Sequence, residues 1–157
     1  PYALQRAQFV ANEGGTGIHI NVWSGLGVYR AIRKQNPNLF IHFQKSGDKF
    51  FTDRRAPNHI YWPVICKIAG WSGADSIHAG MIGGYMNQDE AELKDALGTL
   101  WEYNVIPALS CGMHPGLIDH INVKLNSVNW MANVGGAMHG HPMGTLAGGK
   151  AMRQAID

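Results

Sequence analysis

Two glycine-rich turns constrain the fold of this chain more than any other feature. The turn Ser110-Cys111-Gly112-Met113 follows an apolar stretch at 104–109, and a longer glycine-rich run at 133–144 follows a second stretch at 128–132. Apolar strands that end in such turns and give way to helices are typical of an α/β barrel. Glycines there let backbone N–H groups approach an anion, and the next helix N-terminus adds partial positive charge. The pattern predicts an enzyme of phosphorylated small molecules.

The rest of the chain repeats the same alternation of strand and helix. Further strands are predicted at 18–23, 39–43 and 75–78, and helices at 1–12, 25–34, 61–69, 89–103, 116–125 and 144–156, with a polar loop at 44–53. This alternation predicts parallel strands joined by right-handed crossovers, although an open doubly wound sheet also fits. A complete eightfold barrel needs about 250 residues. The chain has 157 and opens on Pro1 without an initiator Met, so we expect a fragment of a barrel.

Composition narrows the partners and the compartment. Charged residues make up 15% of the chain and the net charge is +2, with both signs mixed, so no basic stripe for nucleic acid is present. No apolar run has membrane length. The two cysteines, Cys66 and Cys111, lack metal-ligand spacing, which favours a reduced setting. We expect a cytoplasmic protein that binds neither nucleic acid nor membrane.

Polar, small and cationic residues stand at the carboxyl ends of the predicted strands, where a parallel barrel gathers its chemistry. They are Asn21, Trp23, Gln44, Lys45, His78, Ser110, Gly112, Gly135 and Gly136. One phosphate could be held by the backbone N–H groups of Gly112, Gly135 and Gly136, with the Ser110 hydroxyl as a further donor. Lys45 and His78 could form a second anion site.

Each of these residues also has an ordinary structural interpretation. Gly135 and Gly136 fit a simple strand-exit turn, and His78 fits a hydrogen-bonded core histidine. Lys45 fits a solvated loop cation. The glycine-rich loop that ends at Tyr85 is long enough to act as a lid, but it also fits an ordinary loop.

The remaining histidines suggest structure more than chemistry. His114, His139 and His141 suggest zinc, but no carboxylate partner lies nearby, so no metal ligand is predicted among them. His19 and His42 precede polar positions on their strands, and we expect alternation to direct them toward the helix layer.

Three strings, taken together, resemble the large subunit of ribulose-1,5-bisphosphate carboxylase/oxygenase (RuBisCO). They are SIHAG at 76–80, SCGMHPG at 110–116, and GGAMHGHP at 135–142 with the tail AGGKAMRQA at 147–155. The resemblance runs over essentially the whole chain and is closest to RuBisCO-like proteins and divergent archaeal forms. It implies a (β/α)8 TIM barrel, of which residues 1–157 cover about the last five βα units. The N-terminal α/β domain and the first barrel strands are then expected outside this chain.

The resemblance also implies a site. Ser110, Gly112, Gly135 and Gly136 match the family's substrate and phosphate positions, and His78 matches the histidine at the other phosphate. Lys45 stands where the family has an arginine, which keeps the charge but loses the bidentate fork. The family binds Mg²⁺ through residues of an earlier strand, so no metal ligand is expected here. Its active sites form between two subunits, which implies a homodimer or higher homo-oligomer.

Three positions depart from the carboxylase pattern. Gln44 and Asp48 stand where carboxylases have histidines, and Tyr85 falls where their flexible loop carries a lysine. A slip of one residue would put Met86 there instead. A tyrosine cannot place a cation over a developing carboxylate. Gln44, His78 and Tyr85 are therefore the candidate catalytic positions, with altered chemistry.

Three functions remain open. The first is a RuBisCO-like lyase or isomerase that uses Mg²⁺ to enolise a phosphorylated ketose. The second is a genuine, carbon-fixing ribulose-bisphosphate carboxylase of divergent archaeal type. The third is a barrel relative that binds a phosphorylated ligand without catalysis. Expressed alone, the fragment is expected to be inactive and to aggregate through exposed strand edges.

Overall fold

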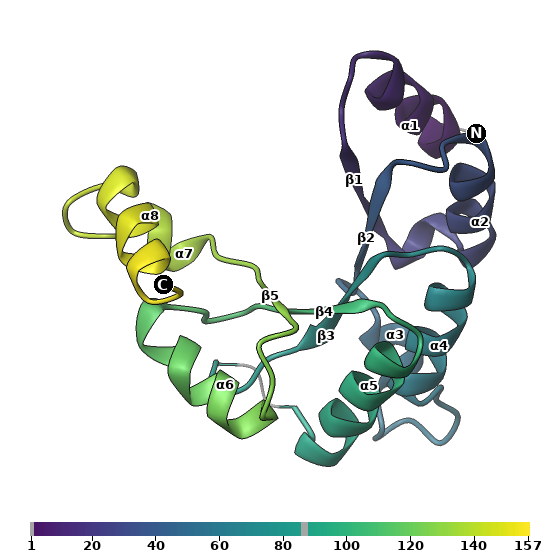
Figure 1. Cartoon of the computed structure of the whole chain (residues 1–157). Coiled ribbons are helices and arrows are strands. Elements are labelled where there is room, and N and C mark those ends of the chain that lie inside the picture. Colours follow the sequence, from purple (N-terminus) through teal and green to yellow (C-terminus); the bar gives the residue numbers. More distant parts are fainter. Residues whose placement is uncertain (1, 86–87) are drawn as a thin grey trace. The chain divides into compact units, whose positions relative to one another are not determined.

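The computed structural model describes residues 2–85 and 88–157 as an α/β fold (Figure 1). In chain order the elements are α1 (Tyr2–Asn12), β1 (Gly17–Asn21), η1 (Val22–Ser24), α2 (Leu26–Gln35), β2 (Phe40–Gln44), α3 (Lys49–Thr52), α4 (Trp62–Trp71), β3 (Ser76–Gly80), α5 (Glu90–Glu102), β4 (Ile106–Leu109), η2 (Pro115–Leu117), α6 (Ile118–Leu125), β5 (Met131–Ala132), α7 (Gly136–His139) and α8 (Thr145–Gln154). The strands form one sheet in the order β1-β2-β3-β4-β5. The register pairs β1 with β2, β2 with β3 and β4 with β5 in parallel, which confirms the predicted barrel-type alternation.

The chain divides into two compact units. Unit 1 comprises residues 1–79 and 90–107, and unit 2 comprises residues 80–89 and 108–157. Unit 1 holds β1 and β2 with helices α1 to α5, and unit 2 holds β5 with helices α6 to α8. Strands β3 and β4 contribute residues to both units.

Unit 1 buries its apolar core between the sheet and helices α2 and α4. Tyr29 of α2 stacks on Phe43 of β2 with ring centroids 4.9 Å apart. The Tyr29 hydroxyl also donates to the carbonyl of Ile20 at 2.6 Å. Phe43 lies 6.2 Å from the ring of Trp62 in α4. These contacts fix which face of β1 and β2 is covered by helices.

The prediction for His19 and His42 was wrong, because both lie on the sheet face opposite those helices. Phe43 packs on the helices, so its neighbour His42 points away from them. His42 and His19 are register partners with ring centroids 4.8 Å apart, and Nδ1 of His42 lies 3.1 Å from Oγ of Ser76. The prediction assumed that the polar residues at the strand ends face away from the histidines. Gln44 is two residues from His42, however, so both side chains lie on the same face of the sheet.

Unit 2 is built around short elements. Strand β5 has two residues, fewer than the five predicted, and α7 was not predicted at all. A Cβ at Gly148 of α8 would lie 2.4 Å from the carbonyl oxygen of Met138, so the small residue lets α8 approach α7 closely. The indole N–H of Trp130 donates to Oδ1 of Asn122 at 2.8 Å, which ties β5 to α6.

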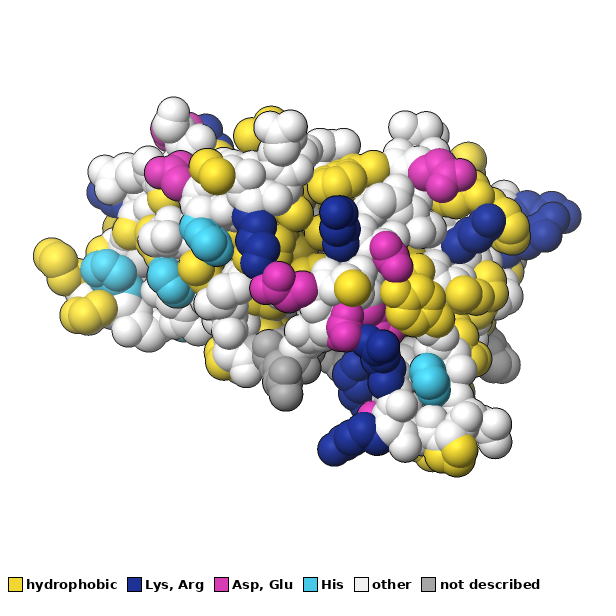
Figure 2. Space-filling model, turned by 90° about the horizontal axis from the view of Figure 1, so that it is seen from below, with side chains coloured by type: hydrophobic (Ala, Val, Ile, Leu, Met, Phe, Trp, Pro, Cys, Tyr) yellow, Lys and Arg dark blue, Asp and Glu magenta, His cyan; other side chains and the backbone are white. Residues whose placement is uncertain are grey.

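Two further observations concern the surface and the loops. The predicted polar loop at 44–53 contains the short helix α3. Figure 2 shows one face on which Lys and Arg side chains alternate with Asp and Glu among hydrophobic ones, consistent with the mixed charge of the sequence. Among the described helices, none has the length and apolarity that a bilayer crossing requires.

Candidate phosphate-binding site

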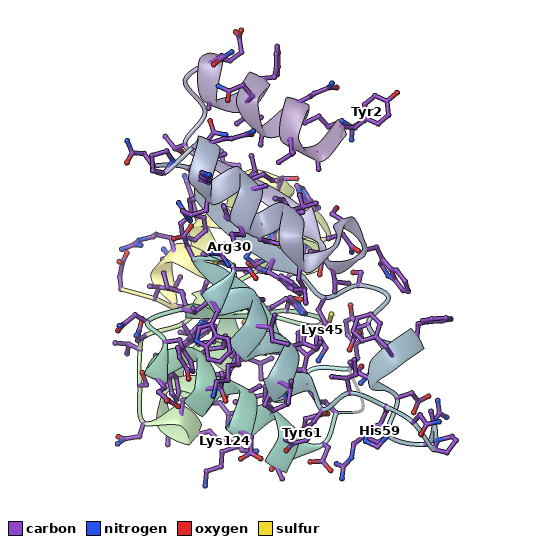
Figure 3. All side chains as sticks on the ribbon, turned by 90° about the vertical axis from the view of Figure 1, so that its right-hand side faces the viewer. Tyr2, Arg30, Lys45, His59, Tyr61 and Lys124 are labelled. Atoms are coloured by element: carbon purple, nitrogen blue, oxygen red, sulfur yellow. The ribbon has the colours of Figure 1, made fainter. Side chains whose placement is uncertain are left out.

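Lys45 follows β2 and is buried in unit 1, with 3% of its surface exposed. Its Nζ lies 4.1 Å from the centroid of the Trp62 ring and 3.8 Å from Oδ2 of Asp48. Figure 3 shows Lys45 within the unit, whereas the labelled His59 and Tyr61 lie on the loop and helix start beyond it. The interpretation of Lys45 as a solvated loop cation is therefore wrong, because a cation–π contact and a carboxylate hold its charge in a dry setting.

Asp48 is the residue that makes this burial tolerable. Burial lowers the pKa of the Lys45 amine, and the negative charge of Asp48 opposes that change. The Asp48 carboxylate also accepts a 2.6 Å hydrogen bond from Oγ1 of Thr52 and lies 3.9 Å from Nζ of Lys49. The i, i+3 spacing of Lys45 and Asp48, with Thr52 one turn later, was the available sequence signal for this network.

His78 of β3 is buried beside the same charges. Burial, followed by the positive charge of Lys45, lowers its pKa to about 4. The imidazole is therefore neutral at pH 7, a form in which one ring nitrogen can donate a hydrogen bond and the other can accept one. A neutral histidine can donate to a phosphate oxygen without adding charge, so the positive charge in this part of unit 1 rests on Lys45.

Gln44 ends β2 and shapes the turn that carries Lys45. Its Oε1 accepts a hydrogen bond from the backbone N–H of Ser46 at 3.1 Å. Asn21, its register partner on β1, donates from Nδ2 to the Ser46 carbonyl at 3.0 Å. The two amides fix the backbone of this turn, and Gln44 supplies no titratable group for acid–base chemistry.

The turn of unit 2 that contains Gly112 leaves no room for a side chain at that residue. Gly112 has φ +101°, and a Cβ there would lie 2.9 Å from Cδ1 of Tyr85. The Tyr85 ring is exposed and lies against this turn. The backbone N–H of Tyr85 donates to the Cys111 carbonyl at 3.4 Å. Met86, the alternative for the family's loop lysine, lies outside the described residues.

Unit 2 contains three further candidate residues. Ser110 precedes this turn in the sequence, and Gly135 and Gly136 follow β5. Oγ of Ser110 lies 3.5 Å from Sγ of Cys111, and the Ser110 N–H donates to the Gly80 carbonyl at 3.1 Å. Gly135 and Gly136 are exposed at the start of α7, and a Cβ at either position would meet no atom within 4 Å. The N–H groups of a first helical turn have no partner within the helix, so they are available to an anion.

The structure thus places the predicted residues in two groups. Gln44, Lys45 and His78 belong to unit 1, while Tyr85, Ser110, Gly112, Gly135 and Gly136 belong to unit 2. Sequence reasoning missed Trp62 and Thr52, whose roles depend on tertiary contacts with Lys45 and Asp48. Within residues 2–85 and 88–157, no three His, Cys, Asp or Glu side chains are arranged to hold a metal ion.

Fold and site together define a parallel α/β protein of the TIM-barrel type, with its candidate ligand residues after the carboxyl ends of the strands. Residues 93–157 match the family described as "Ribulose bisphosphate carboxylase large chain, catalytic domain". A curated relative, ribulose bisphosphate carboxylase of Pyrococcus furiosus, is 38% identical over 98% of this chain and 38% of its own length. The chain belongs to the RuBisCO large-subunit superfamily, and spans about two fifths of the length of the relatives it matches.

Solved structures agree with this assignment. The octameric RuBisCO from Pyrococcus horikoshii, crystallised with sulfate, has a TM-score of 0.85 at 36% identity and covers 98% of this chain and 38% of its own. A RuBisCO-like protein (MtnW) from Alicyclobacillus acidocaldarius has a TM-score of 0.87 at 25% identity, over 98% of this chain and 40% of its own. Both carboxylases and RuBisCO-like proteins are therefore structural neighbours.

Proposed function

We propose that the complete protein is a RuBisCO-like enzyme that enolises a phosphorylated ketose-type substrate, with an isomerisation or decarboxylation as the overall reaction. The observation that carries the proposal is Tyr85. It stands at the position where the resemblance expects a lysine, and its exposed phenol rests on the Gly112 turn. A neutral phenol stabilises an added carboxylate much less than a cation does. Proton abstraction next to a phosphorylated ketone's carbonyl does not need that cation.

In this proposal each unit binds one anionic group with its own residues. Backbone N–H groups of Gly112, Gly135 and Gly136 hold one phosphate, with Ser110 as a hydroxyl donor. Lys45 and His78 act on the second anionic group. Because Asp48 already occupies Lys45, a phosphate there competes with that carboxylate for the amine. Gln44 keeps the turn in place rather than transferring a proton.

Magnesium is the cofactor that the resemblance implies, and the described residues of this chain do not fit a site for it. Mg²⁺ prefers carboxylate oxygens that remain open to water. The acidic residue nearest the candidate site, Asp48, is buried and engaged with Lys45, Lys49 and Thr52. We therefore place any metal ligands of the complete protein outside these residues and assign no step of this chain to the metal.

The complete natural protein that contains this sequence provides the test. Labelled CO₂ is supplied with ribulose-1,5-bisphosphate and Mg²⁺, and proton exchange into a phosphorylated ketone is followed in the same tube. We expect exchange without label in phosphoglycerate. Tyr85→Phe is the matched control and should leave exchange unchanged if the phenol only rests on the turn. Label incorporation by the natural protein would overturn the proposal, and absence of both signals would indicate a binding role.

The second candidate is a genuine ribulose-1,5-bisphosphate carboxylase. The 38% identity with a carboxylase from Pyrococcus furiosus favours it, since the RuBisCO-like protein MtnW is 25% identical. This function requires another cation to replace the loop lysine. Label incorporation that survives Tyr85→Phe would support it, because the phenol would then be dispensable for carboxylation.

We also propose that the protein works as a homo-oligomer. Solved relatives include the octameric RuBisCO from Pyrococcus horikoshii and a dimeric archaeal RuBisCO from Hyperthermus butylicus, which is 26% identical with a TM-score of 0.81. That second relative covers 97% of this chain and 40% of its own. Light scattering of the complete protein should give a mass at least twice that of one subunit, and a monomeric mass would contradict the proposal.

A further inference from the structure

An exposed group of aromatic side chains lies in unit 1 and has no part in the site described above. Trp23 of η1 is 57% exposed and Phe50 of α3 is 84% exposed. The Trp23 ring lies 5.5 Å from the Phe50 ring and 5.8 Å from the Phe51 ring, both edge to face. We call Trp23, Phe50 and Phe51 the aromatic shelf. Exposed aromatic rings that lie next to one another, as those of Trp23 and Phe50 do, are a feature of binding surfaces.

The backbone beneath the shelf is fixed before any ligand arrives. Gly47 has φ +88°, and a Cβ there would lie 2.3 Å from Nε1 of Trp23, so the indole rests directly on the turn. The Trp23 N–H donates to Oδ1 of Asn21 at 2.9 Å, and the Asn21 amide donates to the carbonyl of Ser46 in that turn. A preorganised ring loses little conformational entropy when a ligand covers it.

The shelf occupies the edge of the sheet at which parallel α/β proteins bind ligands. Trp23 follows the carboxyl end of β1, and the turn at Gly47 follows that of β2. Gly47 is two residues from Lys45, a separation that the backbone spans in at most about 7 Å. Lys49 precedes Phe50 in α3 and is about half exposed, so the same short helix carries an accessible cation. Apolar rings beside accessible positive charge suit an anionic ligand with a planar part.

We propose that the aromatic shelf binds a planar ring carried by the phosphorylated substrate of the candidate site. The inference rests on the proposed function, which supplies the phosphate-binding residues. The ring stacks on or against the indole of Trp23, while the phosphate reaches the turn that carries Lys45. The shelf therefore selects aryl over small alkyl phosphates.

A second aromatic pair in unit 1 provides a matched control. Trp71 ends α4 and is 64% exposed, close to the exposure of Trp23, and its ring meets Tyr103 edge to face at 5.8 Å. It precedes the amino end of β3, and Nζ of Lys67 already lies 5.0 Å from its ring. The two tryptophans match in exposure and in having an edge-to-face aromatic partner, but they lie at opposite ends of the strands.

The experiment compares phenyl phosphate with methyl phosphate, by calorimetric titration of the complete natural protein. We expect phenyl phosphate to bind roughly tenfold more tightly, the size that one aromatic stacking contact supplies. Trp23→Ala should abolish the preference, whereas Trp71→Ala should retain it. Gly47→Ala keeps the indole but pushes it from the turn, so it should also abolish the preference, even if Trp23→Ala folds poorly.

Each outcome decides the question. Equal affinity for the two esters overturns the shelf but leaves the proposed phosphate site intact. A preference that survives both Trp23→Ala and Gly47→Ala also overturns it. If these variants lower the mass of the assembly and leave the preference unchanged, the shelf is a contact between copies of this protein. If neither ester binds, the proposed function fails together with this inference.

Discussion

The two units hold their candidate anion-binding groups by different means. Unit 1 uses the buried side chains of Lys45 and His78, whose pKa values are lowered by burial. Unit 2 uses backbone N–H groups at Gly112 and Gly136, whose availability depends on chain conformation. Perturbing charge should therefore affect unit 1 strongly and unit 2 little, and perturbing backbone dihedrals should do the reverse.

The largest effect should come from removing the carboxylate that pairs with Lys45. Asp48→Ala removes the ion-pair partner of a buried amine, and we expect the free energy of unfolding to fall by about 3–5 kcal/mol. The double variant Lys45→Met with Asp48→Ala should recover most of that loss, because the buried amine is removed together with its partner. Urea titration of the complete protein measures both changes. If the double variant is as unstable as the single one, the pair is not the source of the effect.

The pH dependence of stability should be the next largest effect. The pKa of His78 is lowered from 6.5 to about 4 in the folded state. The unfolded chain then binds the proton first, so the His78 contribution is complete above pH 6.5 and is lost as pH falls toward 4. At most about 3 kcal/mol is involved. His42, whose pKa is also lowered to about 4, contributes in the same direction.

His78→Gln separates this contribution from the general acid sensitivity of the protein. Urea midpoints measured at intervals between pH 7 and pH 4 should fall less steeply in the variant than in the natural protein. An unchanged slope would show that burial of His78 does not govern the acid response of unit 1.

Gly112 tests the backbone of unit 2. Gly112→Ala forces a side chain into φ +101° and against Tyr85, with an expected loss on the order of 1–3 kcal/mol. Inorganic phosphate should also bind more weakly, because the turn that presents the N–H groups must shift. Gly149→Ala is the control, because this position in α8 has open space around it. An alanine there should raise the free energy of unfolding by as much as about 1 kcal/mol. Equal effects of the two substitutions would contradict the role of Gly112.

Gly136 should give the smallest effect and the sharpest contrast within unit 2. A Cβ there meets no atom within 4 Å, so Gly136→Ala should change the free energy of unfolding by no more than about 0.5 kcal/mol. Phosphate affinity should persist, because the substitution keeps the backbone N–H. A large loss of affinity, measured by calorimetry, would mean that the phosphate needs the open space beside Gly136 rather than its N–H group.

Much of the fold was accessible from local patterns. The strands at β1 to β4 and the helices α1, α2, α4 and α5 were predicted within a few residues, because apolar periodicity and glycine punctuation are local signals. Helices α3 and α7 have four residues each, too few to produce a periodic pattern. Strand β5 is shorter than its apolar stretch because only Met131 and Ala132 pair with β4.

The candidate site divided in the same way. The turn at Gly112 was predicted because it lies between a strand and a helix, and the positive φ of Gly112 agrees with a turn at this position. The surroundings of Lys45 were not found. Trp62 is 17 positions further along the chain, and nothing local indicates that its ring lies over the amine.

The sequence by itself determined the alternation of parallel strands and helices, the glycine turns and the membership of the superfamily, since each depends on residues close together in the chain. Only the tertiary structure decided that Lys45 is buried on Trp62, that His42 points away from the helices, and that Trp23 stands exposed beside Phe50. Burial and contact depend on residues brought together from distant elements. They set the charge state of His78 and the exposure of the aromatic shelf, and so the chemistry that each can perform.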